Sequence, residues 1–351
     1  MGDTLRVGLV GIGNISGQYL DTLPRLPGVS LVAAADLDPA RTVPDVRMLR
    51  PEELYAADDV DLVLNLTIPR AHADVALSAI GAGKHVYGEK PLALSTVEGR
   101  EVLAAASSAG VRVGCAPDTV LGTGTQTARR CLDDGMIGTP VAATAFMVTP
   151  GHERWHPDPE FYYRPGGGPL FDMGPYYLTA LVTLLGPVRR VTGLASTPRA
   201  TRTIGSGPRA GTEFPVAVAT HVAGVLEHEN GAITTLMMSF DVWAANLPRI
   251  EVYGTHGALS VPDPNAFDGD VKLYEPGREW RTVPTNAGYR NAGRGTGVAD
   301  LAAAVANNTE HRANGTLAYH VLDIMESLLH ATDQGQTQPV TSTTPRPTPV
   351  P

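Results

Sequence analysis

Short apolar runs alternate with amphipathic segments through the first third of the chain. The apolar runs have the length of buried strands and lie at residues 5–10, 29–36, 61–66, 85–88 and 111–115. Between them, apolar residues recur at helical spacing over residues 15–23, from residue 72 onward and over residues 95–109. Strands that alternate with helices at this pace predict a parallel, doubly wound α/β sheet, with functional residues at the carboxyl ends of the strands.

The connection after the second expected strand departs from this pattern. Residues 39–51 contain Pro39, Pro44 and Pro51 and show little helical periodicity. Proline lacks a backbone donor and is poorly tolerated inside helices. We therefore expect a loop in place of a crossover helix.

The rest of the chain has a different pattern. Strand-like runs lie at residues 141–148, 188–195, 216–227, 232–240, 249–253 and 271–274, and no helix separates the later ones. This spacing predicts an open, mainly antiparallel sheet. We expect helices at residues 124–134, 174–185, 298–307 and 317–332, and an extended or disordered end over residues 335–351, which are rich in Thr and Pro.

Composition narrows the classes of function. Hydrophobic residues make up 43% of the chain and charged residues 18%, which is typical of a soluble globular protein, and the net charge of −9 argues against nucleic acid or an anionic membrane as partner. Cys115 and Cys131 lack the spacing of metal ligands, so we expect neither a disulfide framework nor a metal. With no signal segment and no membrane-spanning apolar run in view, we expect a cytoplasmic protein.

The first strand runs into a glycine turn. The residues from Gly11 to Ser16 resemble the dinucleotide-binding fingerprint of Rossmann folds, with a serine at the third position. Gly11 permits the tight turn, Gly13 lets a pyrophosphate approach the backbone, and the next helix presents free N–H groups to it. We predict that the turn binds a dinucleotide through Gly11, Gly13, Asn14 and Ile15.

Asp36 ends the second expected strand, about 20 residues after the glycines. A carboxylate there accepts hydrogen bonds from the adenosine ribose and repels a 2′-phosphate, so that NAD is favoured over NADP. A solvated acid at a strand end is the simpler alternative. Together these features predict a dinucleotide-binding domain over residues 1–120, a substrate-binding and oligomerisation domain over residues 121–335, and a tail over residues 336–351.

Two later motifs carry a resemblance to a known family. Glu89-Lys90-Pro91 follows the fourth strand, and the segment from Gly167 to Tyr176 leads into the helix expected at residues 174–185. With the glycine turn and a strand-turn-strand at residues 253–259, they resemble the glucose-fructose oxidoreductase and inositol dehydrogenase (Gfo/Idh/MocA) family. The resemblance implies NAD or NADP in the first domain, a sugar, polyol or cyclitol in a cleft before the second sheet, and a homodimer or homotetramer.

The resemblance also implies roles for individual residues. Lys90 contacts the substrate hydroxyl and assists proton transfer, and Asp172 is the aspartate of the substrate site. Many members carry a histidine and a second aspartate where this chain has Tyr176 and Thr179. Tyr176 therefore resembles the branch with glucose-fructose oxidoreductase and dihydrodiol dehydrogenase, in which a tyrosine hydroxyl is the proton donor, and Thr179 argues against an inositol-like substrate.

Physical chemistry supports this catalytic set of Lys90, Tyr176 and Asp172. Oxidation of a secondary alcohol removes a proton from oxygen while a hydride leaves carbon. A free tyrosine, with a pKa of about 10, is a poor base, and a nearby ammonium lowers that pKa. The alternatives are a surface lysine, a tyrosine of the apolar stripe and an aspartate at the helix N-cap, and Tyr177 competes with its neighbour for the acid/base role.

The resemblance extends to a larger set of binding residues. The predicted cofactor-binding residues are Gly11, Gly13, Asn14, Ile15, Asp36, Thr67, Pro69, His72, Glu89 and Lys90, with a structural role as the alternative for His72. The predicted substrate-binding residues are Lys90, Asp118, Tyr163, Arg164, Asp172 and Tyr176. His152, Trp155 and His156 form an aromatic loop that could line the substrate site, and Arg290, Asn291 and Arg294 could reach substrate or a neighbouring subunit.

The sequence thus predicts an NAD-dependent oxidoreductase that transfers a hydride between nicotinamide and a secondary hydroxyl or ketone of a carbohydrate. One alternative is a glycosidase or lyase that oxidises a sugar transiently and recycles its NAD in place. A second is a sensor that binds the dinucleotide without catalysis, although retention of a proton relay argues against it.

Overall fold

The computed structural model describes residues 4–351, and residues 1–3 lie outside the described part of the chain. It divides into two compact units. Unit 1 comprises the chain up to Gly122 together with Tyr289–Leu322, and unit 2 comprises Thr123–Gly288 and Asp323–Pro349, while the last two residues are shared between them. Each unit has its own sheet, and we describe each by itself.

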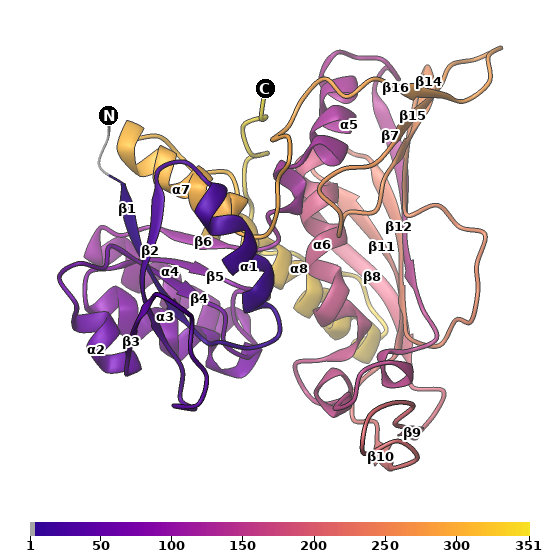
Figure 1. Cartoon of the computed structure of the whole chain (residues 1–351). Helices are drawn as coiled ribbons and strands as arrows, with labels where there is room; N and C mark the ends of the chain where they lie inside the picture. The colour runs from indigo at the N-terminus through magenta and orange to yellow at the C-terminus, as the bar shows by residue number, and fades with distance from the viewer. Residues whose placement is uncertain (1–3) are drawn as a thin grey trace. The chain divides into compact units, whose positions relative to one another are not determined.

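Unit 1 is built on a parallel sheet of six strands in the order β3-β2-β1-β4-β5-β6 (Figure 1). The chain moves outward from β1 in one direction and then in the other, which is the doubly wound arrangement predicted from the sequence. The strands are β1 (Leu5–Val10), β2 (Val29–Ala35), β3 (Arg47–Leu49), β4 (Leu62–Asn65), β5 (His85–Gly88) and β6 (Val113–Cys115).

The helices of unit 1 bury apolar faces against this sheet. They are α1 (Ser16–Thr22), α2 (Pro51–Ala56), α3 (His72–Gly81), α4 (Thr96–Ala109) and α7 (Thr296–Asn307), with 3-10 turns η1 (Leu23–Arg25), η2 (Pro69–Ala71) and η3 (Thr119–Leu121). Val298 and Leu301 of α7 share one core with Leu9, Leu64 and Tyr19. This shared core explains why residues 289–322 group with unit 1, whereas the expected division near residue 120 assigned them to the second domain.

The proline-rich connection after β2 has no crossover helix, as expected. It contains the short strand β3, which the sequence analysis did not predict because three residues give too little alternation to recognise. Helix α2 then begins at Pro51, a position where proline is well tolerated because the first helical N–H has no intrahelical partner.

Unit 2 is built on a sheet of nine strands in the order β16-β15-β14-β13-β7-β12-β11-β8-β17 (Figure 1). Only β7 and β12 pair in parallel, so the prediction of an open, mainly antiparallel sheet is confirmed. The strands are β7 (Pro140–Val148), β8 (Val188–Ser196), β11 (His221–His228), β12 (Ile233–Ser239), β13 (Ile250–Gly254), β14 (Gly257–Val261), β15 (Val271–Tyr274), β16 (Arg281–Val283) and β17 (Gln338–Pro339), and β9 (Thr201–Thr203) pairs separately with β10 (Glu213–Pro215).

One face of this sheet is covered by helices. Helix α6 (Gly168–Leu185) packs on β7, β11 and β12, beside α5 (Thr123–Asp133). Helix α8 (Gly315–Gln334) belongs to unit 1 through Leu322 and to unit 2 from Asp323, and its Leu328 packs so closely on Gly193 and Gly224 that a Cβ at either glycine would clash. The 3-10 turns η4 (His152–Arg154) and η5 (Glu160–Tyr163) lie in the long β7–α6 connection.

The start of α6 differs from the expectation. The helix begins at Gly168, six residues before the predicted start, and its N-cap is Gly167. Pro169 stands in the first turn, where proline is favourable. Asp172 therefore lies inside the helix, four residues before Tyr176, and the N-cap alternative for Asp172 is wrong.

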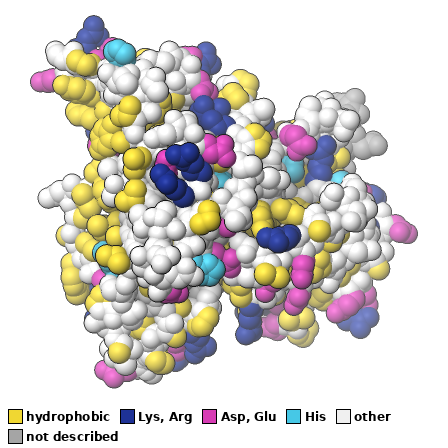
Figure 2. Space-filling view, turned by 180° about the vertical axis from the view of Figure 1, so that it is seen from behind, with side chains coloured by type: hydrophobic (Ala, Val, Ile, Leu, Met, Phe, Trp, Pro, Cys, Tyr) yellow, Lys and Arg dark blue, Asp and Glu magenta, His cyan; other side chains and the backbone are white. Residues whose placement is uncertain are grey.

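The opposite face of the unit 2 sheet exposes apolar side chains. Leu194 of β8, Val225 of β11 and Ile233 of β12 are exposed on this face, and the ladder registers place these three strands side by side. Figure 2 shows hydrophobic side chains gathered along the left edge of its view, the side on which this sheet lies. Between residues 4 and 351, no helix combines the length and apolar character needed to cross a membrane.

The C-terminal segment is extended and ordered rather than disordered. β17 pairs with β8, and the side chains of Val340 and Thr344 are buried. The carboxylate of Asp323 on α8 accepts hydrogen bonds from the backbone N–H groups of Thr341 (3.0 Å) and Ser342 (2.7 Å) and from the Thr341 hydroxyl (3.1 Å). One buried carboxylate thus fastens the segment to α8.

Substitution Asp323→Ala should destabilise unit 2 and release the C-terminal segment. Because the lost hydrogen bonds involve a charged acceptor, we expect the free energy of unfolding to fall by about 2–4 kcal/mol. Denaturant unfolding measures the loss, and limited proteolysis should show faster cleavage after residue 335. Asp333→Ala, at an exposed position of the same helix, is the matched control. Equal stability of the two variants would contradict the fastening role.

Candidate active site

The glycine turn after β1 packs tightly on one side and is open on the other. Gly11 has φ +98°, and a Cβ there would lie 2.8 Å from the backbone of Leu66 and Thr67. A Cβ at Gly13 would meet no atom within 4 Å. The Ser16 hydroxyl donates to the Gly13 carbonyl oxygen at 2.7 Å, which explains how serine serves at the third position of the fingerprint. Gly11 is thus required by the protein's own backbone, and Gly13 leaves space for a ligand.

The amides of this turn fit a dinucleotide pyrophosphate. Within residues 4–351, the backbone N–H groups of Gly13, Asn14 and Ile15 have no hydrogen-bond acceptor. They come directly before α1, whose first turn adds the positive end of the helix dipole. The residues present therefore fit the cofactor that a Rossmann fold implies.

Asp36 braces the same turn from the end of β2. Its carboxylate accepts hydrogen bonds from the N–H of Ile12 (2.6 Å) and of Asp38 (2.9 Å). Arg41, which the sequence analysis did not select, places its guanidinium 3.8 Å from the Asp36 carboxylate and donates to the Ile12 carbonyl oxygen at 3.3 Å. The position of Arg41 five residues after Asp36 is the feature of the sequence that could have predicted this contact.

His72 joins the loops that follow β4 and β5. Its Nδ1 lies 2.6 Å from the Pro91 carbonyl oxygen and its Nε2 lies 3.0 Å from the Thr67 carbonyl oxygen. Asn65 accepts from both the N–H and the hydroxyl of Thr67 and donates to the His72 carbonyl oxygen, just before Pro69 begins η2. The ring is buried, and burial lowers the pKa of His72 below its ordinary value. This placement supports a structural role for His72 rather than direct cofactor binding.

Glu89 and Lys90 follow β5. The buried Glu89 carboxylate accepts from the Tyr19 hydroxyl of α1 at 2.8 Å and from the Lys90 N–H at 3.0 Å. Burial, followed by the charge of Glu89, raises the pKa of Tyr19 well above its ordinary value, so that Tyr19 remains a donor. Lys90 is half-buried, and its peptide bond to Pro91 is cis. Glu89 thus holds the Lys90 backbone against α1, and a direct cofactor contact for it stays a prediction.

Asp118 has an internal partner set. Its side chain is 0% exposed, and its Oδ2 accepts the N–H groups of Gly295 (2.8 Å) and Gly297 (3.0 Å) at the start of α7. Arg294, also buried, lies 3.8 Å from its Oδ1. Burial is the main reason that the pKa of Asp118 is raised. This placement does not fit the predicted substrate contact: Asp118 anchors α7 within unit 1, and Arg290 and Asn291 of the same loop are exposed.

In unit 2, α6 carries the predicted acid/base residues. The Asp172 carboxylate lies 2.9 Å from Nε2 of His152 in η4, and each of the two side chains is 14% exposed. Tyr176 and Thr179 are buried one and two turns further along. Tyr177 is completely buried, and burial raises its pKa strongly, so it is poorly suited to compete for the acid/base role. The sequence analysis placed His152 in an aromatic loop but did not pair it with Asp172.

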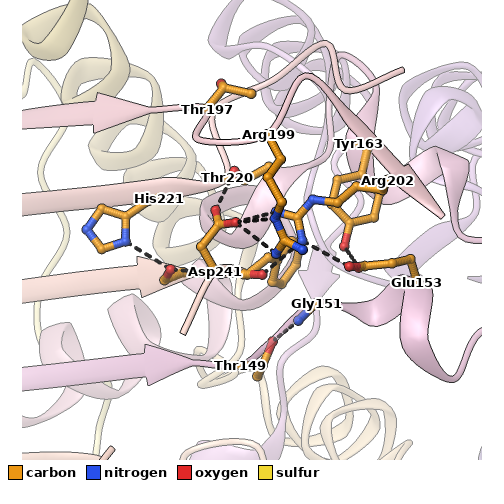
Figure 3. A network of polar contacts seen from close by, with 12 residues as sticks. Thr149, Gly151, Glu153, Tyr163, Thr197, Arg199, Arg202, Thr220, His221 and Asp241 are labelled. Carbon is orange, nitrogen blue, oxygen red and sulfur yellow. Dashed lines mark hydrogen bonds and ion pairs between the residues drawn. The ribbon is translucent and has the colours of Figure 1, made fainter. Parts of the chain in front are cut away.

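Tyr163 belongs to a buried polar network rather than to an accessible surface (Figure 3). Its hydroxyl donates to the Glu153 carboxylate, and its ring lies 5.2 Å from the Arg202 guanidinium. Arg202, with a side chain 0% exposed, pairs with Glu153 at 2.9 Å and with Asp241 at 2.6 Å. The predicted substrate contact of Tyr163 therefore does not fit its burial, whereas the neighbouring Arg164 is exposed.

The histidine-rich loop lacks the side chains that would complete a metal site. Among the described residues, no three His, Cys, Asp or Glu side chains gather as metal ligands would. The loop itself carries His152 and His156, which stand beside aromatic residues.

His72→Asn should reduce the loss of protein stability that occurs as the pH is lowered below 7. Because the folded-state pKa of His72 lies below the unfolded value of about 6.5, the unfolded chain binds more protons between these two values. The free energy of unfolding therefore falls as the pH is lowered from about 7 to 5, and the variant, which cannot titrate there, should lose less. Denaturant unfolding at several pH values measures this. His330→Asn, at an exposed position, is the control, and an unchanged slope in His72→Asn would contradict the expectation.

The chain is similar to several enzymes that are named for sugars or polyols. It is 28% identical over 268 residues to 1,5-anhydro-D-fructose reductase of Ensifer adhaerens, covering 72% of this chain and 74% of that protein. It is 26% identical over 303 residues to D-xylose dehydrogenase of Paenarthrobacter nicotinovorans, covering 79% and 76%. Inositol 2-dehydrogenase of Salmonella typhimurium is 34% identical over 119 residues, covering 31% of this chain and 35% of that protein.

Solved structures share the whole fold. An NAD binding oxidoreductase from Klebsiella pneumoniae superposes with a TM-score of 0.84 at 23% identity, covering 96% of this chain and 99% of that one. Levoglucosan dehydrogenase in complex with NADH and L-sorbose has a TM-score of 0.81 at 19% identity, covering 97% and 100%.

Sequence models of one family match both parts of the chain. The model described as an oxidoreductase family with an NAD-binding Rossmann fold matches residues 5–116, and the GFO/IDH/MocA C-terminal domain model matches residues 125–260. Because the two matches together span most of the chain, the protein belongs to the Gfo/Idh/MocA family of NAD-binding oxidoreductases.

Proposed function

We propose that the protein transfers a hydride reversibly between NAD(H) and a secondary hydroxyl or ketone of a sugar, polyol or related carbohydrate. The observation that carries the proposal is the glycine turn in unit 1, with open space at Gly13, amides that lack an acceptor among the described residues, and the Asp36 brace. The relatives named above as acting on anhydrofructose, xylose and inositol support a carbohydrate as the substrate class.

The residues of unit 1 that would hold the cofactor follow from this turn. The amides of Gly13, Asn14 and Ile15 would bind the pyrophosphate, and Asp36 would accept the ribose hydroxyls, which favours NAD over NADP. Bound NAD supplies the hydride acceptor. The loops that carry Thr67, Pro69 and Lys90 would position the nicotinamide ribose, and His72 would keep these loops together.

Three residues are assigned to the substrate. Lys90 would bind the reacting oxygen as a cation, which favours the alkoxide that forms as the hydroxyl loses its proton. Asp172 and Tyr176, one turn apart on α6, would bind and orient the hydroxyl groups. The exposed Arg164 would add a donor for further hydroxyls.

We also propose that the protein is cytoplasmic and forms a homodimer or homotetramer through the open face of the unit 2 sheet. The exposed Leu194, Val225 and Ile233 make this face apolar, and a second copy of the same face would cover them.

A screen of sugars and polyols with NAD tests the reaction. Net formation of NADH, followed by its absorbance, is the expected result, whereas turnover of a glycoside without net NADH would identify the recycling mechanism instead. Lys90→Ala should lower kcat by about 10²–10⁴-fold while NAD still binds, because it removes the cation that favours the alkoxide, and Tyr176→Phe should also lower turnover, because it removes a hydroxyl that orients the substrate. Lys272→Ala, at an exposed strand position, is the control. Near-parental turnover in both variants would overturn the assignment.

Leu194→Asp combined with Val225→Asp tests the oligomer. Charges on the covered face should lower the molar mass measured by light scattering, since desolvating a carboxylate is costly. Val97→Asp, at an exposed apolar position of α4 in unit 1, should leave the mass unchanged. A parental monomer, or an unchanged mass in the double variant, would contradict this interface.

A further inference from the structure

Asp172 shares its carboxylate with an imidazole that comes from a different segment. Nε2 of His152 lies 2.9 Å from Oδ2 of Asp172, and both side chains keep 14% of their surface exposed. The pair therefore combines a short contact with access to small molecules. Neither residue is in the buried network around Arg202, and within unit 2 the imidazole stands next to the helix that carries Tyr176.

The pairing determines which nitrogen of His152 can accept a proton. An ionised carboxylate can only accept a hydrogen bond, so the neutral imidazole donates from Nε2. Its lone pair is then on Nδ1, which has no hydrogen-bond partner within residues 4–351. A carboxylate that fixes the tautomer of a histidine also stabilises the imidazolium that forms when the histidine takes up a proton.

Aromatic rings limit how the imidazole can turn. The centroid of the His152 ring lies 4.5 Å from that of Phe240, 4.7 Å from that of Tyr162 and 5.4 Å from that of Trp155. Trp155 is itself well exposed. Rings on several sides restrict the χ angles of His152, so its orientation is largely established before a ligand binds.

The next residue along the chain fixes the position of this turn. Glu153 is buried, pairs with Arg202 and accepts from Tyr163 (Figure 3). Its carbonyl oxygen also accepts from the Gly205 N–H at 2.7 Å. Gly151, with φ +110°, has no room for a Cβ because the Glu153 carboxylate occupies that space. The buried ion pair thus holds η4, and His152 with it, against α6.

We propose that His152, oriented by Asp172, is the residue that exchanges a proton with the substrate oxygen. The inference rests on the proposed function. In the oxidation, the O–H bond breaks and its proton passes to Nδ1 of His152, while the hydrogen on the same carbon leaves as a hydride to the oxidised nicotinamide. In the reduction, the proton returns from His152 to the oxygen. Tyr176 then binds a hydroxyl and is not the proton carrier.

The pH dependence of the oxidation is the first test. Because protonated His152 cannot accept a proton, kcat/KM of the parental enzyme should fall on the acid side. His152→Gln should lower kcat/KM by about 10²–10⁴-fold and remove that acid limb. Tyr176→Phe should keep the limb. The titratable groups that face the ring are Asp172 from α6, Tyr162 from η5 and His156 from the same loop, so Asp172→Asn should also change the limb.

Chemical rescue separates proton transfer from a structural role. Imidazole added to His152→Ala should restore part of the activity, because a diffusible base can replace the missing ring, whereas a merely structural defect would not respond. His256→Gln, at an exposed position in unit 2, should behave as the parental enzyme. NMR of the His152 ring nitrogens provides a readout without turnover, since the proton of the neutral ring should lie on Nε2 in the parental protein and no longer be confined to that nitrogen in Asp172→Asn.

The outcomes separate this inference from the proposed function. If the parental protein turns over no carbohydrate with NAD(H), the proposed function fails and the inference falls with it. If the parental protein is active but His152→Gln keeps its rate and its acid limb, only the inference is overturned, and Tyr176 regains the acid/base role.

Discussion

The close packing at Gly11 is the constraint on which unit 1 depends. The turn after β1 can touch the backbone at the end of β4 only because residue 11 has no side chain. Asp36 then holds the turn from β2, His72 joins the β4 loop to the β5 loop, and Glu89 joins the β5 loop to α1. The ends of four neighbouring strands are thereby connected through short polar contacts. A cofactor site formed in this way is largely preorganised, because its loops are already held by one another.

In unit 2, ion pairs of a buried arginine, rather than close backbone packing, hold the loops in one conformation. The long β7–α6 connection is anchored by two ion pairs that the buried Arg202 makes with Glu153 and Asp241. Burying such charges is expensive, and their main benefit is to specify one conformation, since removing a single partner leaves an uncompensated charge. An exposed aromatic loop beside α6 is thus held by a largely buried network, which explains how residues can be accessible and still well oriented.

The sequence was most informative where one local pattern determines one structure. The longer strands of both sheets, the glycine turn and the absence of a crossover helix after β2 followed from periodicity, glycine and proline, whereas the short strands β3, β16 and β17 did not. Contacts between distant segments were less accessible: Asp118 was chosen because it follows a strand, but its partners at Gly295 and Gly297 lie more than 170 residues away. Tyr163 looked like a binding residue for its chemistry, and only its burial beside Glu153 and Arg202 revealed a structural role. The His152–Asp172 pair was hidden for the same reason, since neither residue indicates the other across a 20-residue connection.

The position of Arg41 has a consequence for how this protein could change. After β2, the Arg41 guanidinium lies 3.8 Å from the Asp36 carboxylate, which we propose to exclude a phosphorylated ribose. A homologue in which Asp36 is replaced by a neutral residue would already have, in Arg41, a cation suited to binding that phosphate. A change of preference from NAD to NADP would then require one substitution, at the acid, rather than two.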